Sequence, residues 1–575
     1  MTETQVTQLE KVRAIFDVLH GQREADLLLK NVNILDVHGE TVYHGSLLVY
    51  DKRIVALNPD EASIKVKEVF DGQGLYAIPG LIDAHIHFES QLAHPTALAE
   101  AMVPCGTTTI FAECLDLLSA AGDDGVRAAQ NLFRDYDKLP YRLYAFAPGK
   151  KVAAAVTKEV LEMEPVIGLG EFEHFTYSKG DEDDFHKAAW VREKGGFMNG
   201  HWGLTALSDM TLNYLPAIGV SNNHDVWNGD DIEKSIRYGF PTHIKFGVGS
   251  NEVIKTLLRS IVDRKFPTEN FMLCTDNISV ERLLKMGHMD WIISLCAEMG
   301  INPIKAIKMA SYNTAKSFNM DDQIGSLTPG RFADIVLTDS LSNINPLYVF
   351  KDGELIAQNK QMLKHVEIDY SEMCTEAVEG LGDLTPEQLD LELLEVSEDG
   401  SKAKVYLFDV YGRGHAKFYQ EIWLPLKDGK VVQQYEGEKL SRLAVVQRYA
   451  DGKRHIVTGL FKGVYVESGA VATFWPAPYP YFVAVGQDSE EMCYCLKEVD
   501  KYSGACIVTE NQEKKSVMPL EIYGVMANMT VDELTASASS IDQALEQLGN
   551  HNEGEPVVNK LLSLFISLHR FRFMK

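Results

Sequence analysis

The chain has 575 residues, of which 45% are hydrophobic and 24% charged, the balance of a folded globular protein long enough for two or three domains. Its 82 acidic and 55 basic residues give a formal net charge of −27, a field that repels polyanions and makes nucleic-acid polymers and anionic membrane surfaces poor partners. The eight cysteines are scattered, and the sequence shows neither a leader pattern nor an apolar run of membrane-spanning length, so we expect a cytoplasmic protein.

Short β-rich runs flank a central block of the chain. Residues 4–20 favour a surface helix, and β-rich runs with turns at His38-Gly39 and His44-Gly45 follow from Ala25. A second β-rich fragment occupies residues 325–356. Each piece predicts a small sheet.

Between these pieces, residues 81 to about 317 alternate short apolar runs with amphipathic segments such as 252–263 and 278–298. Strands that alternate with helices indicate a parallel sheet, and this many repeats favour a (β/α)8 barrel. Catalytic side chains of such barrels lie where strands end, so apolar runs that finish in His, Glu or Asp mark candidate site residues.

After about residue 366 the composition changes. Residues 366–400 are strongly acidic and favour a linker with a surface helix, and new β-rich runs follow. We expect a separate C-terminal domain.

The first apolar run of the block ends in His85 and His87, which alternate along a strand and therefore point to the same side. Such a pair is suited to grip one metal ion, although a His-x-His pair is also common as an ordinary solvated or core pair. Four further runs end in metal-binding residue types, namely Glu171, His201, His224 and Asp276. Four imidazoles and two carboxylates at one barrel mouth predict one or two divalent ions, with a bridging carboxylate if there are two. We interpret the histidines without this placement as structural: His94, His174, His186, His243 and His288.

Several segments, in order, resemble the landmarks of the adenine deaminases in the amidohydrolase superfamily: PGLIDAHIHFES, PCGTTTIFAE, GLGEFEHF, NGHWGL, MLCTD, PIKAIKMASYNTAKSF and GSLTPGRFADIVL. The resemblance spans about residues 20–365 and, more loosely, the C-terminal domain. It implies an α/β fold in which a metal-dependent (β/α)8 barrel is joined to a composite β-sandwich built from both flanking pieces, plus a C-terminal α+β domain. The implied limits are 1–80, 81–317, 318–365 and 366–575. It also implies Mn, Fe or Zn as the metal, a homodimer or a larger homo-oligomer, and ligand roles for His85, His87, Glu171, His201, His224 and Asp276.

The expected chemistry is attack by metal-bound hydroxide on a ring carbon, since coordination lowers the pKa of water from 15.7 to about 7. Asp276 would act as both ligand and proton shuttle. Glu89 is a second catalytic candidate that contacts the substrate ring; its alternative reading is a solvated carboxylate or a helix cap.

The chain departs from the family pattern in three substrate-facing motifs. The usual Asp-Pro-His-Glu is Glu113 to Asp116, an Arg-Glu-Gly segment is Lys245 to Gly247, and His-Asp-Ser-His-Asn is replaced by residues 477–481 within FWPAPYPY. Because apolar and aromatic groups replace polar ones, a bulkier or N6-alkylated purine becomes a candidate beside adenine. The predicted substrate-binding residues are Glu113, Asp116, Phe246, Trp475, Tyr479 and Tyr481. The aromatic segment is otherwise an ordinary Pro-rich surface loop.

Three functions follow as hypotheses. The first is hydrolytic deamination of an aminopurine at C6, giving hypoxanthine and ammonia or an amine. The second is hydrolysis of a cyclic amide or another C–N bond by the same metal chemistry. The third is a non-catalytic protein that retains the barrel.

Overall fold

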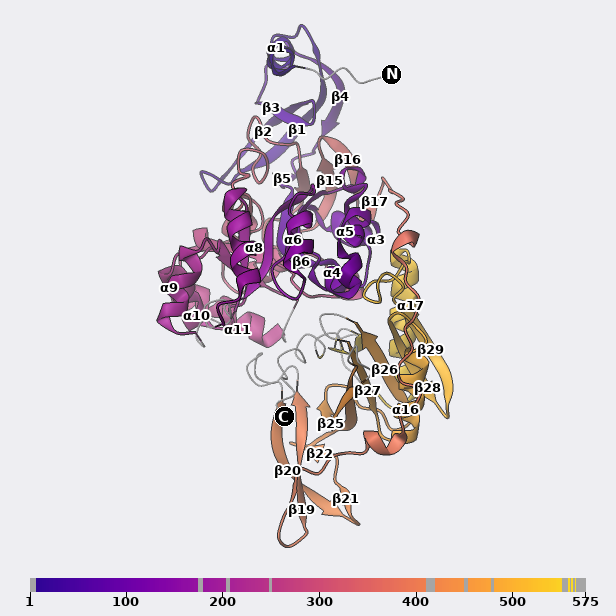
Figure 1. Ribbon diagram of the computed structural model, residues 1–575. Helices are drawn as coiled ribbons and strands as arrows, with labels where there is room; N and C mark the ends of the chain where they lie inside the picture. Colours follow the sequence, from indigo (N-terminus) through magenta and orange to yellow (C-terminus); the bar gives the residue numbers. More distant parts are fainter. Residues whose placement is uncertain are drawn as a thin grey trace.

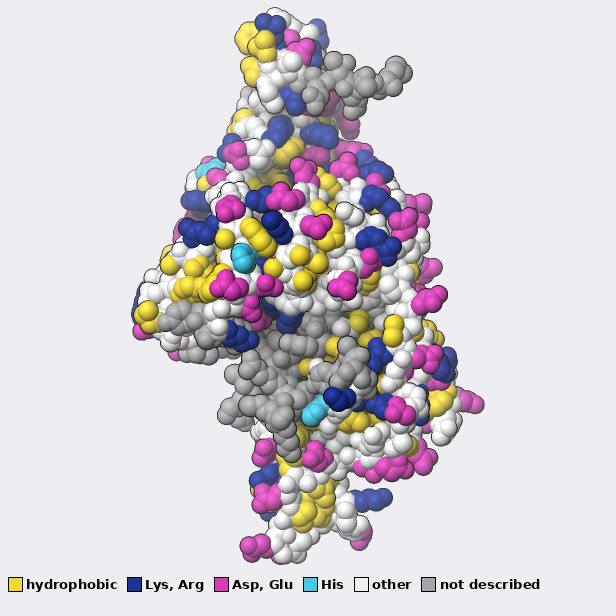
Figure 2. Space-filling model, viewed as in Figure 1, with side chains coloured by type: hydrophobic (Ala, Val, Ile, Leu, Met, Phe, Trp, Pro, Cys, Tyr) yellow, Lys and Arg dark blue, Asp and Glu magenta, His cyan; other side chains and the backbone are white. Residues whose placement is uncertain are grey.

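The computed structural model describes residues 7–173, 179–202, 207–247, 251–409, 419–448, 453–476 and 480–550, with residues 557, 558, 560, 561 and 564 (Figure 1). The chain begins with helix α1 (Gln8–Leu19), at whose start Thr7 and Glu10 form a reciprocal capping box. Leu9, Val12 and Phe16 of α1 are exposed. Figure 2 shows hydrophobic side chains, in yellow, at the tip of the molecule where α1 lies. The helix was predicted at this place.

Both flanking β pieces join into one sheet. Within the described residues this sheet has nine strands in the order β17-β16-β15-β14-β5-β1-β2-β3, with β4 beside β1. Their bounds are β1 (Glu24–Asp36), β2 (Thr41–Tyr50), β3 (Arg53–Leu57), β4 (Lys65–Asp71), β5 (Tyr76–Pro79), β14 (Ile335–Thr338), β15 (Pro346–Lys351), β16 (Glu354–Gln358) and β17 (Gln361–Met362). The two pieces meet where β14 pairs antiparallel with β5, with Ile335 opposite Pro79. The composite character is confirmed, and hydrogen bonds link all of these strands into a single sheet.

The central block forms the predicted parallel barrel. Its eight described strands are β6 (Leu81–His87), β7 (Thr107–Glu113), β8 (Arg142–Pro148), β9 (Val166–Glu173), β10 (Phe197–His201), β11 (Asn222–Asn223), β12 (Thr242–Lys245) and β13 (Phe271–Cys274). Each pairs in parallel with the next along the chain. The barrel closes just beyond β13, where the backbone N–H of Asp276 donates to the carbonyl of His85 at 2.9 Å. Closure therefore brings the last strand end directly beside the first.

Helices follow most of the barrel strands and cover the outside. They are α2 (Phe88–Gln91), α3 (Pro95–Met102), α4 (Leu115–Ala121), α5 (Gly125–Phe133), α6 (Ala154–Val160), α8 (Glu182–Glu193), α9 (Asp209–Ala217), α10 (Gly229–Arg237), α11 (Asn251–Asp263), α12 (Val280–Met286), α13 (Met289–Glu298), α14 (Pro303–Met309) and α15 (Tyr312–Ser317). Side-chain caps define several starts, such as Asn228 on α10 and Ser279 on α12. The amphipathic run at 278–298 forms two helices instead of one, because Gly287 adopts φ +97° and ends α12.

The C-terminal part contains a second large sheet, confirming the separate β-rich domain. The sheet has ten strands in the described chain: β18 (Glu395–Val396), β19 (Lys402–Asp409), β20 (Tyr419–Lys427), β21 (Lys430–Val431), β24 (Ser441–Arg448), β25 (Arg454–Lys462), β26 (Ala470–Trp475), β27 (Tyr481–Gly486), β28 (Ala505–Glu510) and β29 (Glu513–Pro519). A small hairpin adds β22 (Gln434–Tyr435) and β23 (Glu438–Lys439). Helix α16 (Ser489–Val499) packs on β26, β27 and β28, and α17 (Val531–Gln547) on β28 and β29.

The surface helix predicted within residues 366–400 is absent from this described segment, whose helical elements are two short 3-10 helices, Ser371–Met373 and Pro386–Leu389. The physical reason is burial: Leu381, Leu384 and Leu389 pack into the core of the C-terminal sheet. Residues 366–400, here called the strap, are thus held against the C-terminal sheet by these leucines. The helix prediction was wrong.

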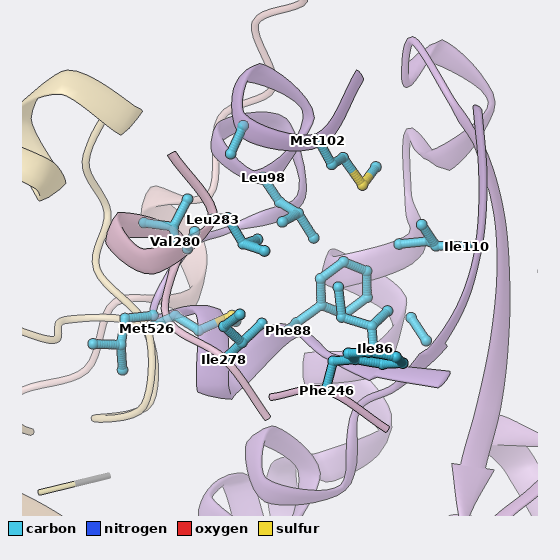
Figure 3. Packing of buried hydrophobic residues seen from close by; sticks show 14 of the residues in the cluster. Ile86, Phe88, Leu98, Met102, Ile110, Phe246, Ile278, Val280, Leu283 and Met526 are labelled. Atoms are coloured by element: carbon cyan, nitrogen blue, oxygen red, sulfur yellow. The ribbon is translucent and has the colours of Figure 1, made fainter. Parts of the chain in front are cut away.

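The C-terminal domain packs against the mouth side of the barrel. The backbone N–H of Ala527 donates to the carbonyl of Leu92 at 3.0 Å, and the Tyr523 hydroxyl donates to Asp124 at 2.6 Å. Figure 3 shows Met526 near Phe88 and Ile278, so side chains of both domains share one apolar cluster. None of the described helices combines the length and apolarity needed to cross a membrane.

Candidate metal centre

The first ligand group lies where β6, β9 and β13 end. His85, His87, Glu171 and Asp276 are buried and offer atoms within 4.8 Å of one another. The Nε2 atom of His87 is 3.3 Å from Glu171 Oε1 and 3.4 Å from Asp276 Oδ1, and the two Nε2 atoms of the histidine pair are 3.2 Å apart. The alternation along β6 therefore aims both imidazoles into the barrel mouth, as the spacing predicted.

The second ligand group shares a residue with the first. It consists of Glu171 with His201 at the end of β10 and His224 just after β11. Glu171 Oε1 lies 3.1 Å from His201 Nδ1 and 3.3 Å from His224 Nε2, and these two nitrogens are 2.8 Å apart. All six predicted ligands thus meet in one place, with Glu171 common to both groups.

Two lysines, Lys150 partly buried and Lys245 buried, border this cluster. Lys150, just after β8, has its Nζ 2.7 Å from Glu171 Oε2 and 2.8 Å from Glu173 Oε1. Lys245 on β12 has its Nζ 2.8 Å from Asp225 Oδ1 and 3.3 Å from Asp276 Oδ2. Each ammonium therefore lies beside one of the two carboxylate ligands.

The ligand pKa values follow from these contacts. Burial disfavours the charged form of Glu171, but His201 and Lys150 outweigh it and hold its pKa well below the usual range. Burial likewise opposes Asp276, yet Lys245 and the nearby histidines lower its pKa to about 2. Both carboxylates are therefore ionised at neutral pH, the form that binds a cation.

The pKa values of His224 and His87 are shifted in opposite directions. Burial and the proximity of His85 lower the pKa of His224 to about 3, so it is neutral and has a lone pair for a metal. Burial also acts on His87, but Glu171 and Asp276 outweigh it and raise its pKa to about 10. Without another cation, a proton on His87 thus compensates the two carboxylates.

A divalent cation fits this donor set. Imidazole nitrogen and carboxylate oxygen are ligands of Zn, Fe and Mn, and the converging lone pairs repel one another unless positive charge lies between them. The ring nitrogens that face Glu171 are His85 Nε2, His87 Nε2, His201 Nδ1 and His224 Nε2. A cation between the ligand atoms would compensate a cluster that otherwise brings four rings and two carboxylates together.

Glu89 and Asp116 lie together near the mouth. The Glu89 side chain is buried; one oxygen accepts a hydrogen bond from the Leu117 backbone at 2.8 Å, and the other makes none in the described structure. Burial, with the proximity of Asp116, raises the pKa of Glu89 to about 8, and burial raises that of Asp116. Glu89 is thus no solvated carboxylate and does not cap α2, but its hydrogen bond from the Leu117 backbone, in the first turn of α4, is the contact of a helix cap, the alternative reading.

Glu113 lies beside His85, from which its Oε1 is 3.6 Å away at Nδ1, and it accepts a hydrogen bond from Asn199 at 3.1 Å. Asn199 in turn accepts one from Asn222 at 2.7 Å. This chain of polar groups ends on the Nδ1 side of the His85 ring. The other ring nitrogen, Nε2, faces Glu171. These polar groups are suited to orient His85. Contact with substrate stays a prediction for Glu113.

The aromatic substrate-binding candidates have differing environments. Phe246 is fully buried and lies among Ile86, Phe88 and Ile278 (Figure 3), so its ring is part of the apolar core under the mouth. Trp475 and Tyr481 face each other across β26 and β27, and both are almost buried. Tyr479 lies outside the described residues, as do Ala477 and Pro478.

An apolar cavity lies beside Trp475, between the C-terminal sheet and Leu92. Its lining includes Leu92, which follows α2, together with Thr473, Trp475, Cys506 and Met518 of the C-terminal sheet. Trp475 therefore lies where the C-terminal domain meets the segment that carries Glu89. The substrate-binding roles of Trp475 and Tyr481 stay predictions.

The histidines interpreted as structural differ in their surroundings where they are described, and neither buried ring nitrogen of His243 has a hydrogen-bond partner among the described residues. His94 accepts a hydrogen bond from the Ala97 backbone at the start of α3, and His288 lies 3.2 Å from Asp83 inside the barrel. His243 is buried, and His174 lies outside the described residues.

Sequence reasoning missed Lys150 and Asp225. Lys150 follows an apolar run, the same signal that marked the ligands, but lysine is not a metal ligand and was passed over. Asp225 directly follows His224, and a polar pair at a strand end could have identified it.

The closed parallel barrel with two ligand groups at its strand ends defines a metal-dependent hydrolase of the amidohydrolase type. Residues 245–356 match the amidohydrolase family, and residues 419–568 match the adenine deaminase C-terminal domain. A curated adenine deaminase from Desulforamulus reducens is 34% identical over 92% of this chain and 90% of its own length. The chain belongs to the adenine deaminase family.

Other relatives span the chain equally well. The adenine deaminases of Kosmotoga olearia and Moorella thermoacetica are 28% and 26% identical, over 93% and 98% of this chain and 91% and 96% of their own. Among solved structures, a zinc-bound adenosine deaminase from Xanthomonas campestris has a TM-score of 0.46 at 14% identity, covering 61% of this chain and 96% of that one. That likeness is too distant to bear on substrate or metal.

Proposed function

We propose that this protein is a metal-dependent deaminase that hydrolyses the exocyclic amine at C6 of an aminopurine, either adenine or an N6-substituted adenine such as N6-methyladenine. The supporting observation is the pair of ligand groups that share Glu171 at the mouth of an adenine deaminase-family barrel. The products are hypoxanthine and ammonia, or the corresponding amine. The shared carboxylate supports two ions of Mn, Fe or Zn.

Different residues of this chain would have different roles in the reaction. The ions, when held by His85, His87, Glu171, His201, His224 and Asp276, supply Lewis acidity and a lowered pKa for water. Asp276, ionised because Lys245 lies 3.3 Å away, accepts the proton released as water adds to C6. It then delivers that proton to the departing nitrogen, so the C6–N bond breaks and the added oxygen stays on C6.

Glu89 would bind the purine ring. Its raised pKa makes it a protonated carboxylic acid at neutral pH, so the oxygen without a hydrogen bond can present an O–H to a ring nitrogen. Asp116 would act with it, since its carboxyl lies close enough to raise the pKa of Glu89. Asp276 and Glu89 thus have distinct tasks, one ionised and one neutral.

The substrate range would extend beyond adenine. The cavity bordered by Trp475 and Leu92 is apolar, and it lies against the segment that follows the ligand strand β6. An alkyl group on N6 is the kind of substituent that such a lining favours over water. Trp475 and Tyr481 would supply the apolar side of the site, and Phe246 would support it from the core beneath the mouth.

The test is a product assay with manganese-, iron- and zinc-loaded protein on adenine, N6-methyladenine and N6-dimethyladenine, followed by chromatography for hypoxanthine. Turnover of any of these, lost on chelation and restored by metal, supports the proposal. No hypoxanthine from the whole panel, with turnover of hydantoins, lactams or acylated amino acids instead, would assign the cyclic-amide alternative. No turnover of any substrate, with no metal bound, would support the non-catalytic alternative.

We also propose that the protein acts in the cytoplasm as a homodimer. Both statements rest on the family resemblance and on composition. Light scattering of the purified chain at several concentrations would give the mass of the assembly, and a monomer mass throughout would contradict the dimer.

A further inference from the structure

The two oxygens of Glu171 have different neighbours. His85, His87, His201 and His224 all make their recorded contacts with Oε1, at 3.7, 3.3, 3.1 and 3.3 Å respectively. Oε2 instead lies 2.7 Å from the ammonium of Lys150. One oxygen thus faces every histidine of both ligand groups, and the other faces a cation of the chain itself.

The position of Lys150 is built into the backbone. Gly149 precedes it and donates its N–H to the carbonyl of Gly170 at 2.6 Å, one residue before Glu171. A Cβ at Gly149 would lie only 2.5 Å from the Glu171 carbonyl oxygen, so a larger residue would push the strand ends apart. The close approach of β8 and β9 at this glycine brings Lys150 against Glu171.

Lys150 is also held from its other side. Its ammonium lies 2.8 Å from Glu173 Oε1, and the Lys150 side chain is 11% exposed. Glu171 and Glu173 are two residues apart on β9 and so lie on the same side of the strand. An ammonium between two carboxylates in a site with little water has little freedom to leave either, because an unpaired buried charge is costly.

We propose that Lys150 is a positioning residue for the metal centre: by occupying Oε2, it makes Glu171 present a single oxygen, Oε1, as the bridge between the two ions. A carboxylate with both oxygens free can instead bind one ion through both oxygens, or it can rotate away from one of the two ligand groups. Held as it is, Glu171 keeps Oε1 midway between the histidines of β6 and those of β10 and β11. This inference rests on the proposed function, because it assumes that the site holds two ions.

The experiment measures metal binding without substrate. Metal-stripped full-length protein is titrated with Mn²⁺ by calorimetry, and the bound metal is counted after dialysis. Lys150→Met is expected to bind manganese about 10- to 100-fold more weakly than the unchanged protein, the usual cost of losing a group that orients a metal ligand. Lys150→Arg keeps a cation that can contact both carboxylates and is expected to restore most of the affinity.

Lys187→Met is the matched control. Lys187 is a buried lysine of α8 whose Nζ donates to the carbonyl of Val152, close to the Lys150 loop, and its recorded hydrogen bond is to no ligand. Losing it should lower stability but leave the manganese affinity unchanged. If Lys150→Met does not fold, Lys150→Gln replaces it, since an amide can still donate to one carboxylate without a charge, and a loss in the same direction is expected.

Manganese binding that is unchanged or tighter without Lys150 would contradict the positioning role. A lysine that acted only as a nearby positive charge would repel the ions, so its removal would tighten manganese binding. Unchanged or tighter binding in the Lys150→Met protein overturns the inference while leaving the proposed function intact. Failure of the unchanged protein to bind manganese, iron or zinc would instead remove the proposed metal centre itself.

Discussion

Lys245→Met is expected to destabilise the barrel strongly, and more in the metal-free protein than in the metal-loaded one. The Lys245 ammonium is 2.8 Å from Asp225 and 3.3 Å from Asp276, and all three side chains are at most 3% exposed. At an effective dielectric constant of about 20, an opposite charge at the longer distance corresponds to about 5 kcal/mol.

Since removing one partner of a buried pair leaves an uncompensated charge, the expected loss of unfolding free energy is about 3–5 kcal/mol. Trp227 adds to it, since its ring centre lies 4.6 Å from the ammonium. For a barrel-sized unit this corresponds to a melting temperature lower by roughly 6–20 °C. A bound ion beside Asp276 would replace part of the lost charge, so saturating Mn²⁺ should recover part of the drop.

The assay is thermal unfolding by circular dichroism in chelator and in excess Mn²⁺. Lys67→Met is the control, because its pair with Asp26 is exposed, at 58% and 38%, and should be worth less than about 1 kcal/mol. Equal small shifts in both variants, or no difference between metal-free and metal-loaded protein, would refute the reasoning that Lys245 compensates the buried carboxylates.

Three further predictions concern activity and pH. Asp276→Ala and His201→Ala should fold but lose several orders of magnitude in turnover, measured beside circular dichroism; near-normal turnover of the Asp276 variant would refute the proton-shuttle role. In metal-free protein, Glu89 favours folding below pH 4.5, and this contribution should be lost as pH rises toward about 8, because burial and Asp116 raise its pKa in the fold. Glu89→Gln should therefore flatten the decline of melting temperature between pH 5 and pH 8, and an unchanged slope would contradict it. Trp475→Ala should lower kcat/KM for N6-methyladenine more than for adenine; an equal effect on both would show that Trp475 does not read the N6 substituent.

Local patterns in the sequence were enough to locate the metal centre. Alternation on a strand puts His85 and His87 on one side whatever surrounds them, and parallel barrel strands bring their ends to one face. Glu171, His201, His224 and Asp276 lie within two residues of such strand ends, so period and order predicted that all six residues would meet at one face. The barrel and the two flanking β pieces were predictable for the same reason.

Interactions between separate strands were decided only by the tertiary structure. Nothing in the local sequence tells which oxygen of Glu171 faces the histidines, because that depends on Lys150 arriving from the neighbouring strand end through a close glycine contact. The packing of Met526 beside Ile278 likewise depends on how the C-terminal domain packs on the barrel (Figure 3).

The acidic segment after residue 366 shows the same division. Its composition predicted a surface helix, but Leu381, Leu384 and Leu389 are buried under a sheet formed by residues farther along the chain. Burial of these leucines outweighs a weak helix preference, since helix propensities differ by tenths of a kcal/mol per residue whereas a buried leucine contributes about 1.5–3 kcal/mol. The sequence alone thus determined the repeating elements and the ligand types at their ends. Packing between distant segments decided which charged groups surround each ligand and where residues 366–400 run. The electrostatic and burial energies responsible arise only when the segments meet.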